Sequence, residues 1–475
     1  MRWTNRDPCL RVPESFLTTS GDSLSDPLTL SAAPAANPAS LSSHTIRKLR
    51  FRILPFVFLV FIVAMLDRLN IGFAALTMNQ ELGISGQQFG LLFGIFFFGY
   101  FLFEIPSNLL MHKIGARVWI ARILLSWGLI AMLTGLVRNV HQLYLARFLL
   151  GLAEAGYFPG MALYLTYWFP RREHARAVAL LIAASPVTSI VGAPLSGFIL
   201  DHVHWLSISS WRWLLILEGA PAILFGILTY FVLPSRPQEA KFLSTEEKTW
   251  LQSELSREEG EKLGQHRYSV FQAMKSGRVW QLAVTYFGMM VGNYVLQSWT
   301  PQLVKSVASH YSNSIIGVLV MIPNLLGLVA MIVVSHHSDR TLERRWHVAL
   351  SAIAAASALI LLSTTSSPLY IVVFLCLLAV GVFSHFGPFW ALPSEFLTGY
   401  SAAAGIALIN SIGNLGGFAG PYTIGLIATR SGSLSPGLAI AGVPLFMSAL
   451  LIVLLPRNAA AGGPKLNPQA ETGPS

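Results

Sequence analysis

The sequence predicts an all-α membrane protein in which twelve transmembrane helices form two pseudo-symmetric six-helix bundles. Only 11% of the 475 residues are Asp, Glu, Lys or Arg, whereas roughly 25% is usual in soluble domains. Hydrophobic residues make up 53% of the chain, and its mean hydropathy is +0.58. Apolar runs long enough to cross a bilayer lie on both sides of a charged central segment. So little charge cannot cover the surface of a soluble fold of this size, which excludes a soluble enzyme.

A helix needs about 20 mostly apolar residues to cross the hydrocarbon of a bilayer, and each such run is predicted to be one span. The first span contains Asp67 and Arg68, and the eleventh is rich in glycine, so these two are the least apolar. In chain order the spans are expected at 53–75, 88–111, 116–137, 142–165, 177–199, 211–233, 280–300, 315–337, 347–365, 369–392, 400–425 and 436–455.

The central segment 234–279 has a different composition from the spans. Its stretch "LSTEEKTWLQSELSREEGEK" (243–262) places Ser244 and Thr245 ahead of Glu247 and then mixes charges with a few apolar residues. Capping residues followed by sparse apolar positions predict a short amphipathic helix on the membrane surface. We therefore expect a tail over 1–50, a first bundle over 51–233, this linker, a second bundle over 280–456 and a second tail over 457–475.

The two tails are predicted to be disordered and cytoplasmic. Residues 1–44 are rich in Ser, Pro and Ala and lack the apolar core of a signal peptide. With both termini inside, the cytoplasmic segments collect 25 of the 32 Lys and Arg residues, and the outer loops collect 3. Cytoplasmic loops carry such an excess whatever the function. The formal charge of +10 therefore indicates orientation and not a nucleic-acid partner.

A repeated loop supports the division into two halves. "NLLMHKIGAR" (108–117) lies between spans two and three, and "VVSHHSDRTLERR" (333–345) lies between spans eight and nine. Lys113 and Arg340 take corresponding places in the two loops, and Asp339 precedes Arg340. Two six-helix halves related by such a repeat are typical of transporters that bind substrate between the halves near mid-membrane.

Several longer motifs carry a family resemblance. "SDRTLERR" (338–345) resembles the loop signature of the major facilitator superfamily. "LDRLNIGFAALTMNQELGIS" (66–85), "GYFLFEIPSNLLMHKIGAR" (99–117) and "RFLLGLAEAGYFPGMALYLTYWFP" (147–170) together resemble its anion:cation symporter family. The resemblance covers about 50–455 and is closest to bacterial tartrate-type and sugar-acid transporters. His112 stands where the superfamily pattern has Asp, which puts the charge-relay role of the first loop in doubt.

Ionisable residues inside spans cost at least about 2.5–3.5 kcal/mol at the bilayer centre, so each needs a partner or a function. Asp67 and Arg68 are adjacent and point about 100° apart, so only one of them faces a cavity. Glu154 is flanked by small residues that let another helix approach closely. Asp67 and Glu154 are our candidates for proton coupling. The alternatives are a local ion pair for Asp67 and Arg68, and a structural salt bridge from Glu154 to Arg147 or another span.

Arg68 is the candidate substrate ligand, because a guanidinium offers a planar fork for a carboxylate. The resemblance also implies an arginine at this position that holds the substrate anion. Tyr100 is a candidate hydroxyl donor, with an interfacial aromatic as the alternative. Arg147 is predicted to be a structural or gating partner. Glu104, near the cytoplasmic end of its span, is predicted to be a gate or a packing contact.

The second half offers polar and aromatic candidates in place of a charge pair. Tyr294 and Gln297 in span seven are predicted to contact substrate. The resemblance to sugar-acid carriers favours Trp390 and Asn410 as cavity residues, with helix–helix contacts as the alternative for the asparagine. Lys113, Asp339 and Arg340 are predicted to act in structure or gating. No residue set has metal-ligand spacing, and no cofactor is expected.

These patterns favour a secondary active transporter that imports a small organic anion, a tartrate-like dicarboxylate or a sugar acid, by proton symport with alternating access. The alternative is an exporter or antiporter of the same fold for drugs or organic phosphates. A membrane enzyme is not expected, because the sequence has no nucleophile–base set or phosphate loop. We expect a multi-pass protein of the bacterial inner membrane that works as a monomer, with the substrate anion, protons and the bilayer as its partners and no nucleic acid.

Overall fold

The structure is a computed structural model that describes residues 38–263, 275–393 and 399–456. The ordered elements in these ranges are helices, which confirms the predicted all-α class. Ten helices of the described chain are long and apolar enough to cross a membrane. These ten helices coincide with ten of the twelve predicted spans, and the seventh and eleventh predicted spans are not among them. Those two spans are also helical, but they are more polar or interrupted.

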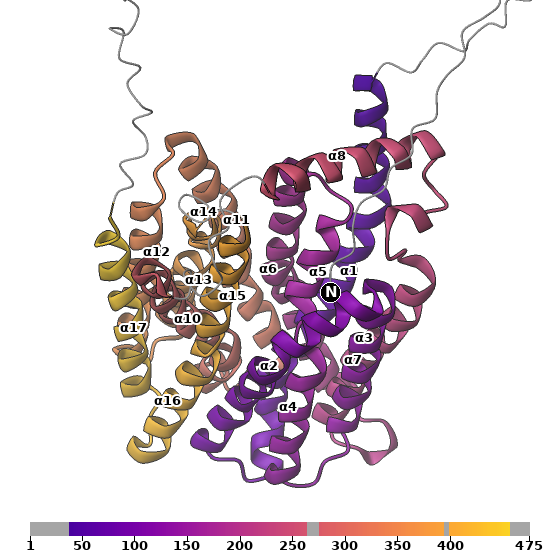
Figure 1. The fold of residues 1–475 in the computed structure, drawn as a ribbon. Coiled ribbons are helices and arrows are strands. Elements are labelled where there is room, and N and C mark those ends of the chain that lie inside the picture. Colours follow the sequence, from indigo (N-terminus) through magenta and orange to yellow (C-terminus); the bar gives the residue numbers. More distant parts are fainter. Residues whose placement is uncertain (1–37, 264–274, 394–398, 457–475) are drawn as a thin grey trace, which may run out of the picture.

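The helices divide into two bundles that lie side by side (Figure 1). In the first bundle, α3 packs along α7 and α2 packs along α4, and in the second, α12 packs along α17 and α11 along α13. The first bundle comprises α1 (Pro38–Glu81), α2 (Gly86–Ile114), α3 (Ala116–Thr134), α4 (Val140–Glu154), α5 (Tyr157–Thr166), α6 (Arg171–His202) and α7 (Ser210–Val232). The second comprises α10 (Gly277–Val307), α11 (Asn313–Thr341), α12 (Arg345–Ser363), α13 (Pro368–Ser384), α14 (Phe386–Ala391), α15 (Gly399–Asn414), α16 (Gly416–Ser431) and α17 (Ser435–Val453).

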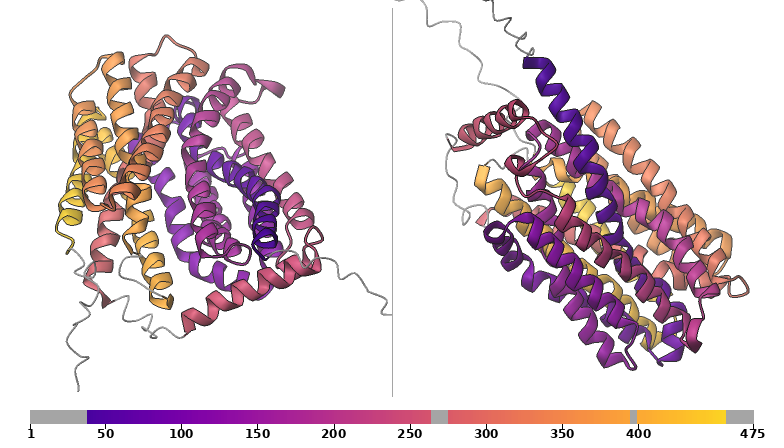
Figure 2. Two further views of the ribbon diagram at one scale, coloured as in Figure 1. Left: turned by 90° about the horizontal axis from the view of Figure 1, so that it is seen from above. Right: turned by 90° about the vertical axis from the view of Figure 1, so that its right-hand side faces the viewer.

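Helix α8 (Thr245–Leu263) forms most of the described linker and lies across one end of the first bundle (Figures 1 and 2). Ser244 caps it, because its hydroxyl accepts a hydrogen bond from the backbone N–H of Glu247 while that carboxylate accepts from the Ser244 N–H. Residues 264–274 of the predicted linker lie outside the described residues, as do the tails 1–37 and 457–475. We call this end of the molecule the α8 end and the opposite end the far end.

Helix α1 begins earlier than the sequence predicts. Residues 38–50, assigned to a disordered tail, form its first turns. They are held by contact with the linker, because Glu247 of α8 accepts hydrogen bonds from Lys48 and contacts His44, and Leu49 is fully buried. The composition of this segment gives no indication of a partner so distant in the sequence.

Three predicted spans are broken into two helices each. The fourth is divided between α4 and α5, where Gly156 takes a left-handed conformation with φ of 80°. A Cβ at Gly156 would lie 2.6 Å from the hydroxyl oxygen of Ser107, so the close approach also requires glycine. The tenth and eleventh spans divide into α13 and α14 and into α15 and α16. The break after α4 places Glu154 at a helix end inside the first bundle.

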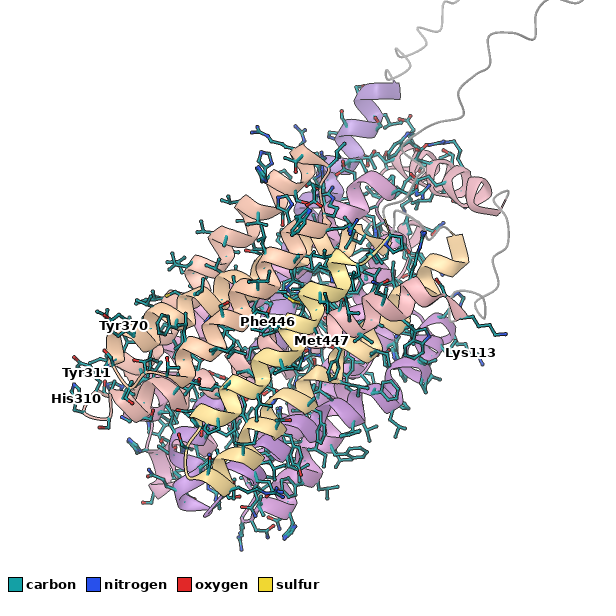
Figure 3. The ribbon with its side chains drawn as sticks, turned by 90° about the vertical axis from the view of Figure 1, so that its left-hand side faces the viewer. Lys113, His310, Tyr311, Tyr370, Phe446 and Met447 are labelled. Carbon is teal, nitrogen blue, oxygen red and sulfur yellow. The ribbon has the colours of Figure 1, made fainter. Side chains whose placement is uncertain are left out.

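The two bundles meet most closely toward the far end. Helix α6 packs along α11, and α2 packs along α16. Gly86 and Gly197 allow these approaches, because a Cβ there would press on backbone atoms of Gly425 and Asn313. Figure 3 identifies the two ends, with Lys113 projecting at the α8 end and His310 and Tyr311 at the far end.

Candidate functional site

A cavity lies between the two bundles at mid-depth. It encloses about 690 Å³ not filled by atoms, part of which is open to solvent. Aromatic residues form much of its wall, and the second bundle contributes four amide side chains. Its lining is Phe61, Met65, Arg68, Tyr100, Phe158, Ile182, Ser185, Tyr286, Met290, Asn293, Tyr294, Gln297, Phe386, Trp390, Asn410 and Asn414.

The structure brings all six residues that the sequence nominates as substrate ligands onto this cavity. Arg68 and Tyr100 come from α1 and α2 in the first bundle, and the other four come from the second. They are separated by as many as 342 positions along the chain, so the shared cavity is a property of the fold.

Arg68 provides the positive charge of the cavity. Its guanidinium forms an ion pair with Glu154, whose side chain is buried, while 14% of the Arg68 side chain remains exposed. The same guanidinium lies 5.3 Å from the ring centroid of Phe96 and 5.2 Å from that of Tyr100. The faces of both rings stabilise the cation. Arg68 is therefore held by aromatic faces and by an internal carboxylate.

Asp67 faces away from the cavity into the first bundle. Its carboxylate accepts a hydrogen bond from Nδ2 of Asn70 at 2.8 Å and another from the indole N–H of Trp127. The residue is 3% exposed. The adjacent residues Asp67 and Arg68 thus point to different surroundings, as their helical offset requires.

Arg147 does not pair with Glu154, although the two share a helix face. The structure pairs Glu154, the last residue of α4, with Arg68 of α1 instead. Arg147 is buried, and its guanidinium lies 5.1 Å from the centroid of Phe96, the ring that also faces Arg68. Two cations of the first bundle therefore interact with the Phe96 ring.

Glu104 connects the two bundles. Its carboxylate accepts hydrogen bonds from Nδ2 of Asn410 at 3.1 Å and from the hydroxyl of Ser411 at 3.0 Å. These two hydrogen bonds join α2 of the first bundle to α15 of the second. Glu104 is ten residues from the α8 end of its helix, which corresponds to about 15 Å.

The second bundle contributes an aromatic and amide wall. Tyr294 donates its hydroxyl to Oδ1 of Asn414 at 3.1 Å, and its ring lies 4.4 Å from that of Phe97 in the first bundle. Tyr286 stands edge to face with Trp390 at 5.0 Å. These contacts hold the rings of Tyr294, Tyr286 and Trp390 in place. Gln297, which also lines the cavity, takes part in none of them.

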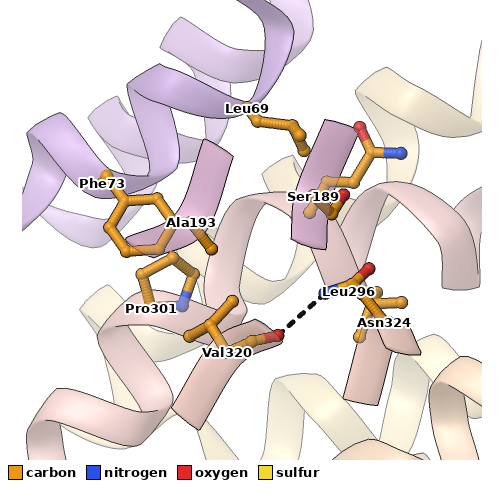
Figure 4. Close-up of a pocket in the computed structure, with 9 residues that line it drawn as sticks. Leu69, Phe73, Ser189, Ala193, Leu296, Pro301, Val320 and Asn324 are labelled. Atoms are coloured by element: carbon orange, nitrogen blue, oxygen red, sulfur yellow. Dashed lines mark hydrogen bonds between the residues drawn. The ribbon is translucent and has the colours of Figure 1, made fainter. Parts of the chain in front are cut away.

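A smaller cavity of about 310 Å³ lies beyond Gln297 (Figure 4). Gln297 lines both cavities, and the smaller one is mostly apolar, with Ser189 and Asn324 among its polar residues. Nδ2 of Asn324 donates to the backbone oxygen of Val320, so this amide is already partnered within α11.

The three loop residues lie apart from the cavity, at the α8 end. Lys113 is exposed in the last turn of α2. Asp339 forms an ion pair with Arg344 at 2.6 Å, and Arg340 is exposed beside it. No group of three His, Cys, Asp or Glu side chains suited to a metal ion occurs in the described ranges.

The sequence did not identify Trp127, Asn70 or Phe96 as parts of this site. Phe96 stands four residues before Tyr100, which is the spacing of one helix face and could have indicated it. Trp127 lies in a different span from Asp67, and nothing in the local pattern of either span links them. Such contacts follow from helix packing.

Known proteins resemble this chain along most of its length. The sequence profile described as Major Facilitator Superfamily matches residues 57–421. A protein of Agrobacterium vitis provisionally named a tartrate transporter is 43% identical over 418 residues, which cover 88% of this chain and 92% of that protein. A quinolone resistance transporter of Acinetobacter baumannii is 38% identical, over 86% of this chain and 94% of that one.

Two further comparisons are with a third relative and with a solved structure. The inner membrane transport protein RhmT of Escherichia coli K12 is 35% identical, over 88% of this chain and 97% of that protein. The xylose transporter XylE from E. coli, in a partially occluded inward-open conformation, superposes with a TM-score of 0.68 at 15% identity, covering 86% of this chain and 98% of that one. This structural likeness concerns the fold alone.

Proposed function

The chain belongs to the Major Facilitator Superfamily, whose members are transporters and not enzymes, and we propose that it imports a small organic anion together with protons. Within the superfamily we assign it to the anion:cation symporters, on the motifs around Arg68 and Glu154. A tartrate-like dicarboxylate or a sugar acid is the proposed substrate class. The relatives with names that refer to tartrate support this assignment.

One observation carries the proposal: Arg68 lines the cavity between the bundles and is paired with a carboxylate of the protein itself. A substrate carboxylate has the same charge and geometry as the side chain of Glu154. Two carboxylates cannot both hold one buried guanidinium without leaving an uncompensated charge in a medium of low dielectric constant. Substrate binding at Arg68 therefore favours a proton on Glu154.

This competition couples the substrate to a proton. In the proposed cycle, the anion displaces Glu154 from Arg68, and Glu154 takes a proton as it loses its partner. With a monocarboxylate the loaded cavity then carries no additional net charge, and with a dicarboxylate a second proton, on Asp67, gives the same balance. The neutralised cavity permits the bundles to rock about the site. Release of the proton restores the Arg68–Glu154 pair and expels the anion. Asp67 is the second proposed coupling carboxyl, held by Asn70 and Trp127.

We assign the α8 end to the cytoplasm and the structure to an inward-facing state. The excess of Lys and Arg in the segments of this end supports the orientation. The close packing of α2 on α16 and of α6 on α11 supports closure at the far end. The protein is then a multi-pass protein of the bacterial inner membrane with both termini inside, working as a monomer.

The test is uptake into proteoliposomes under an inward proton gradient, with labelled tartrate and a panel of sugar acids. We expect accumulation above equilibrium and alkalinisation of the outer medium. Glu154→Gln should abolish accumulation yet retain exchange of labelled for unlabelled substrate across the membrane. If no anion accumulates, or if accumulation is independent of the proton gradient, the proposal is wrong.

A second candidate is export of an aromatic drug, which the 38% identical quinolone resistance transporter favours. The rings of Phe61, Phe158, Tyr286, Phe386 and Trp390 line the cavity and would accommodate a flat aromatic compound. Expression in a drug-sensitive host separates the candidates. A rise in resistance that is retained by Arg68→Ala would favour export over anion import.

A further inference from the structure

Helix α3 carries a cation on the face that it turns to the bilayer. The helix is long and apolar enough to span a membrane, and it lies on the side of the first bundle away from the second (Figure 1). Residues that recur every three or four positions share one face of a helix. On α3 one such set is apolar and exposed, except at Arg122, which is partly exposed. Its apolar members, which we call the α3 stripe, are Val118, Leu125, Leu129 and Leu133, each 37–53% exposed.

The guanidinium of Arg122 is held in place but not neutralised. It lies 4.0 Å from the ring centroid of Trp119, and that indole is itself fixed, because its N–H donates to the hydroxyl of Ser107 on α2 at 3.0 Å. Nη1 of Arg122 also donates to the hydroxyl of Ser126 at 3.4 Å. Within the described ranges no carboxylate forms an ion pair with this cation. A guanidinium has five N–H donors, so most of them are available to an anion.

The depth of Arg122 brings its side chain within reach of lipid headgroups at the α8 end. Helix α3 begins at that end with Ala116, and six residues of helix correspond to about 9 Å along the axis. An arginine at this depth keeps its methylene stem among the acyl chains and extends its charged group to the interface. The α3 stripe continues from Leu125 to Leu133, deeper in the hydrocarbon. A phosphate at the guanidinium and an acyl chain along the stripe would belong to one phospholipid.

We propose that Arg122 binds the phosphate of an anionic phospholipid in the leaflet at the α8 end, with an acyl chain of that lipid on the α3 stripe. A cation on a membrane-facing surface is costly unless an anion pairs with it. Glu239, an acidic residue at this end, is already paired with Arg117. The planar fork of a guanidinium suits two phosphate oxygens, and an anionic headgroup brings no cation of its own to compete. This site is independent of the proposed transport function.

Lipid binding to the purified, delipidated protein tests the inference. Native mass spectrometry measures how tightly the first molecule of phosphatidylglycerol binds, compared with phosphatidylcholine of the same acyl chains. The parent protein should bind phosphatidylglycerol more tightly than phosphatidylcholine. Arg122→Gln should bind phosphatidylglycerol at least about tenfold more weakly than the parent, because hydrogen bonds to a charged group are lost. Equal binding of the two lipids by the parent, or equal binding of phosphatidylglycerol by parent and variant, overturns the inference.

Arg138→Gln is the matched control, because Arg138 is an exposed cation near the far end and the two variants have the same net charge. It should bind phosphatidylglycerol as the parent protein does. An equal loss of binding in both variants would mean that overall charge attracts the lipid, and the site would be wrong. Arg122→Gln should melt at the parent temperature in lipid-free detergent, since it loses no ion pair within the described protein. Its weaker lipid binding is then not a result of unfolding.

Phosphatidylglycerol with a photoreactive group in its acyl chain locates the site. Cross-links should map to the segment with Leu125, Leu129 and Leu133 and should be lost in Arg122→Gln. Cross-links confined to other helices would contradict the proposal. Inorganic phosphate has no acyl chain and should not displace the lipid, and displacement would mean that a free anion is the ligand. A disulfide between two copies of Leu129→Cys in bilayers would show that a second copy of the chain covers the stripe, and the lipid assignment would be wrong.

Discussion

Asp201 of α6 accepts hydrogen bonds from both the backbone N–H of Ser314, at 2.7 Å, and its hydroxyl, at 2.6 Å. Ser314 is the second residue of α11 in the other bundle, and the N–H and Nδ2 of Asn313, the first residue, also donate to Asp201, at 3.0 and 2.9 Å. A carboxylate of one bundle thereby caps a helix of the other. The N-terminus of a helix favours a negative charge, so this contact fastens the bundles at the far end.

Removing this carboxylate should open the far end. Hydrogen bonds to a charged group contribute about 1.5–3 kcal/mol each. Asp201→Ala should therefore raise the population of molecules that are open at the far end, relative to those closed there, at least about tenfold. Ser312 still caps α11 in the variant, because its hydroxyl accepts from the N–H of Ile315. Spin-label distances between the end of α6 and the start of α11 measure the shift.

The control is Glu81→Ala, which removes a far-end carboxylate bonded to Trp211 and Arg212 inside the first bundle. It should leave the distance between α6 and α11 unchanged. An Asp201→Ala variant with the distance distribution of the parent protein would show that the contact does not hold the bundles together.

The contrast between Asp201 and Arg68 shows what the sequence could predict. Arg68 was identified because a charge inside an apolar run is conspicuous by itself. Asp201 stands at the end of its span, where an acidic residue is ordinary, and its partners are more than 110 positions away. The all-α fold followed from hydropathy, which is a local property.

The partners of the charges depend on packing between helices and could not be predicted. Arg147 and Glu154 share a face of α4, yet Glu154 pairs with Arg68 on α1, a different helix. The extension of α1 to Pro38 depends in the same way on Glu247 in the linker. Hydropathy contains no information about such distant contacts.

Replacing Arg68 should weaken substrate binding strongly even when the charge is kept. Arg68→Lys retains a cation, but an ammonium lacks the planar fork and is more strongly hydrated. We expect the affinity for the substrate anion to fall at least about a hundredfold, since a charge-assisted bidentate contact is lost. Equilibrium binding of labelled substrate measures this directly. Arg122→Lys, at a guanidinium stacked 4.0 Å from the Trp119 ring centroid, is the matched control and should bind normally.

Docking of α8 on α1 should depend on the ionisation of Glu247. Burial raises the pKa of Glu247, but hydrogen bonds from Lys48, the Ser244 backbone and His44 outweigh it and hold the pKa below its usual value. A depressed folded-state pKa stabilises docking above the ordinary glutamate pKa of about 4.3. This stabilisation is lost as the pH falls through the folded-state value.

Protection of the α8 amides against hydrogen exchange, relative to an unfolded peptide at the same pH, should therefore stay high from neutral pH down to about pH 5. It should be lost under stronger acid. Glu247→Gln should exchange fast at every pH. Glu254→Gln is the control, because Glu254 pairs with Arg257 on the same helix and not with α1. Equal exchange in the two variants would mean that Glu247 does not dock α8.

Gly90 of α2 should be required for closure at the far end. A Cβ at this position would lie 2.5 Å from the carbonyl oxygen of Pro421 and 2.8 Å from Cα of Tyr422. These are backbone atoms of α16, and they cannot move aside as a flexible side chain would. Gly90→Val should therefore hold α2 and α16 apart at the far end and slow uptake, because the bundles can no longer complete their approach. The same variant should remain folded, since the strain is relieved when the bundles separate.

Gly99, on the same helix, provides the matched comparison. A Cβ there would press on the backbone oxygen of Phe148 in α4, and α2 and α4 belong to one bundle. Separation of the bundles cannot relieve that clash, so Gly99→Val should lower the melting temperature, as overpacking costs about 1–3 kcal/mol. Gly90→Val should melt near the parent protein while its far-end distance distribution broadens. If both variants melt at the same reduced temperature, the α2–α16 contact is a permanent part of the core and not a surface that opens.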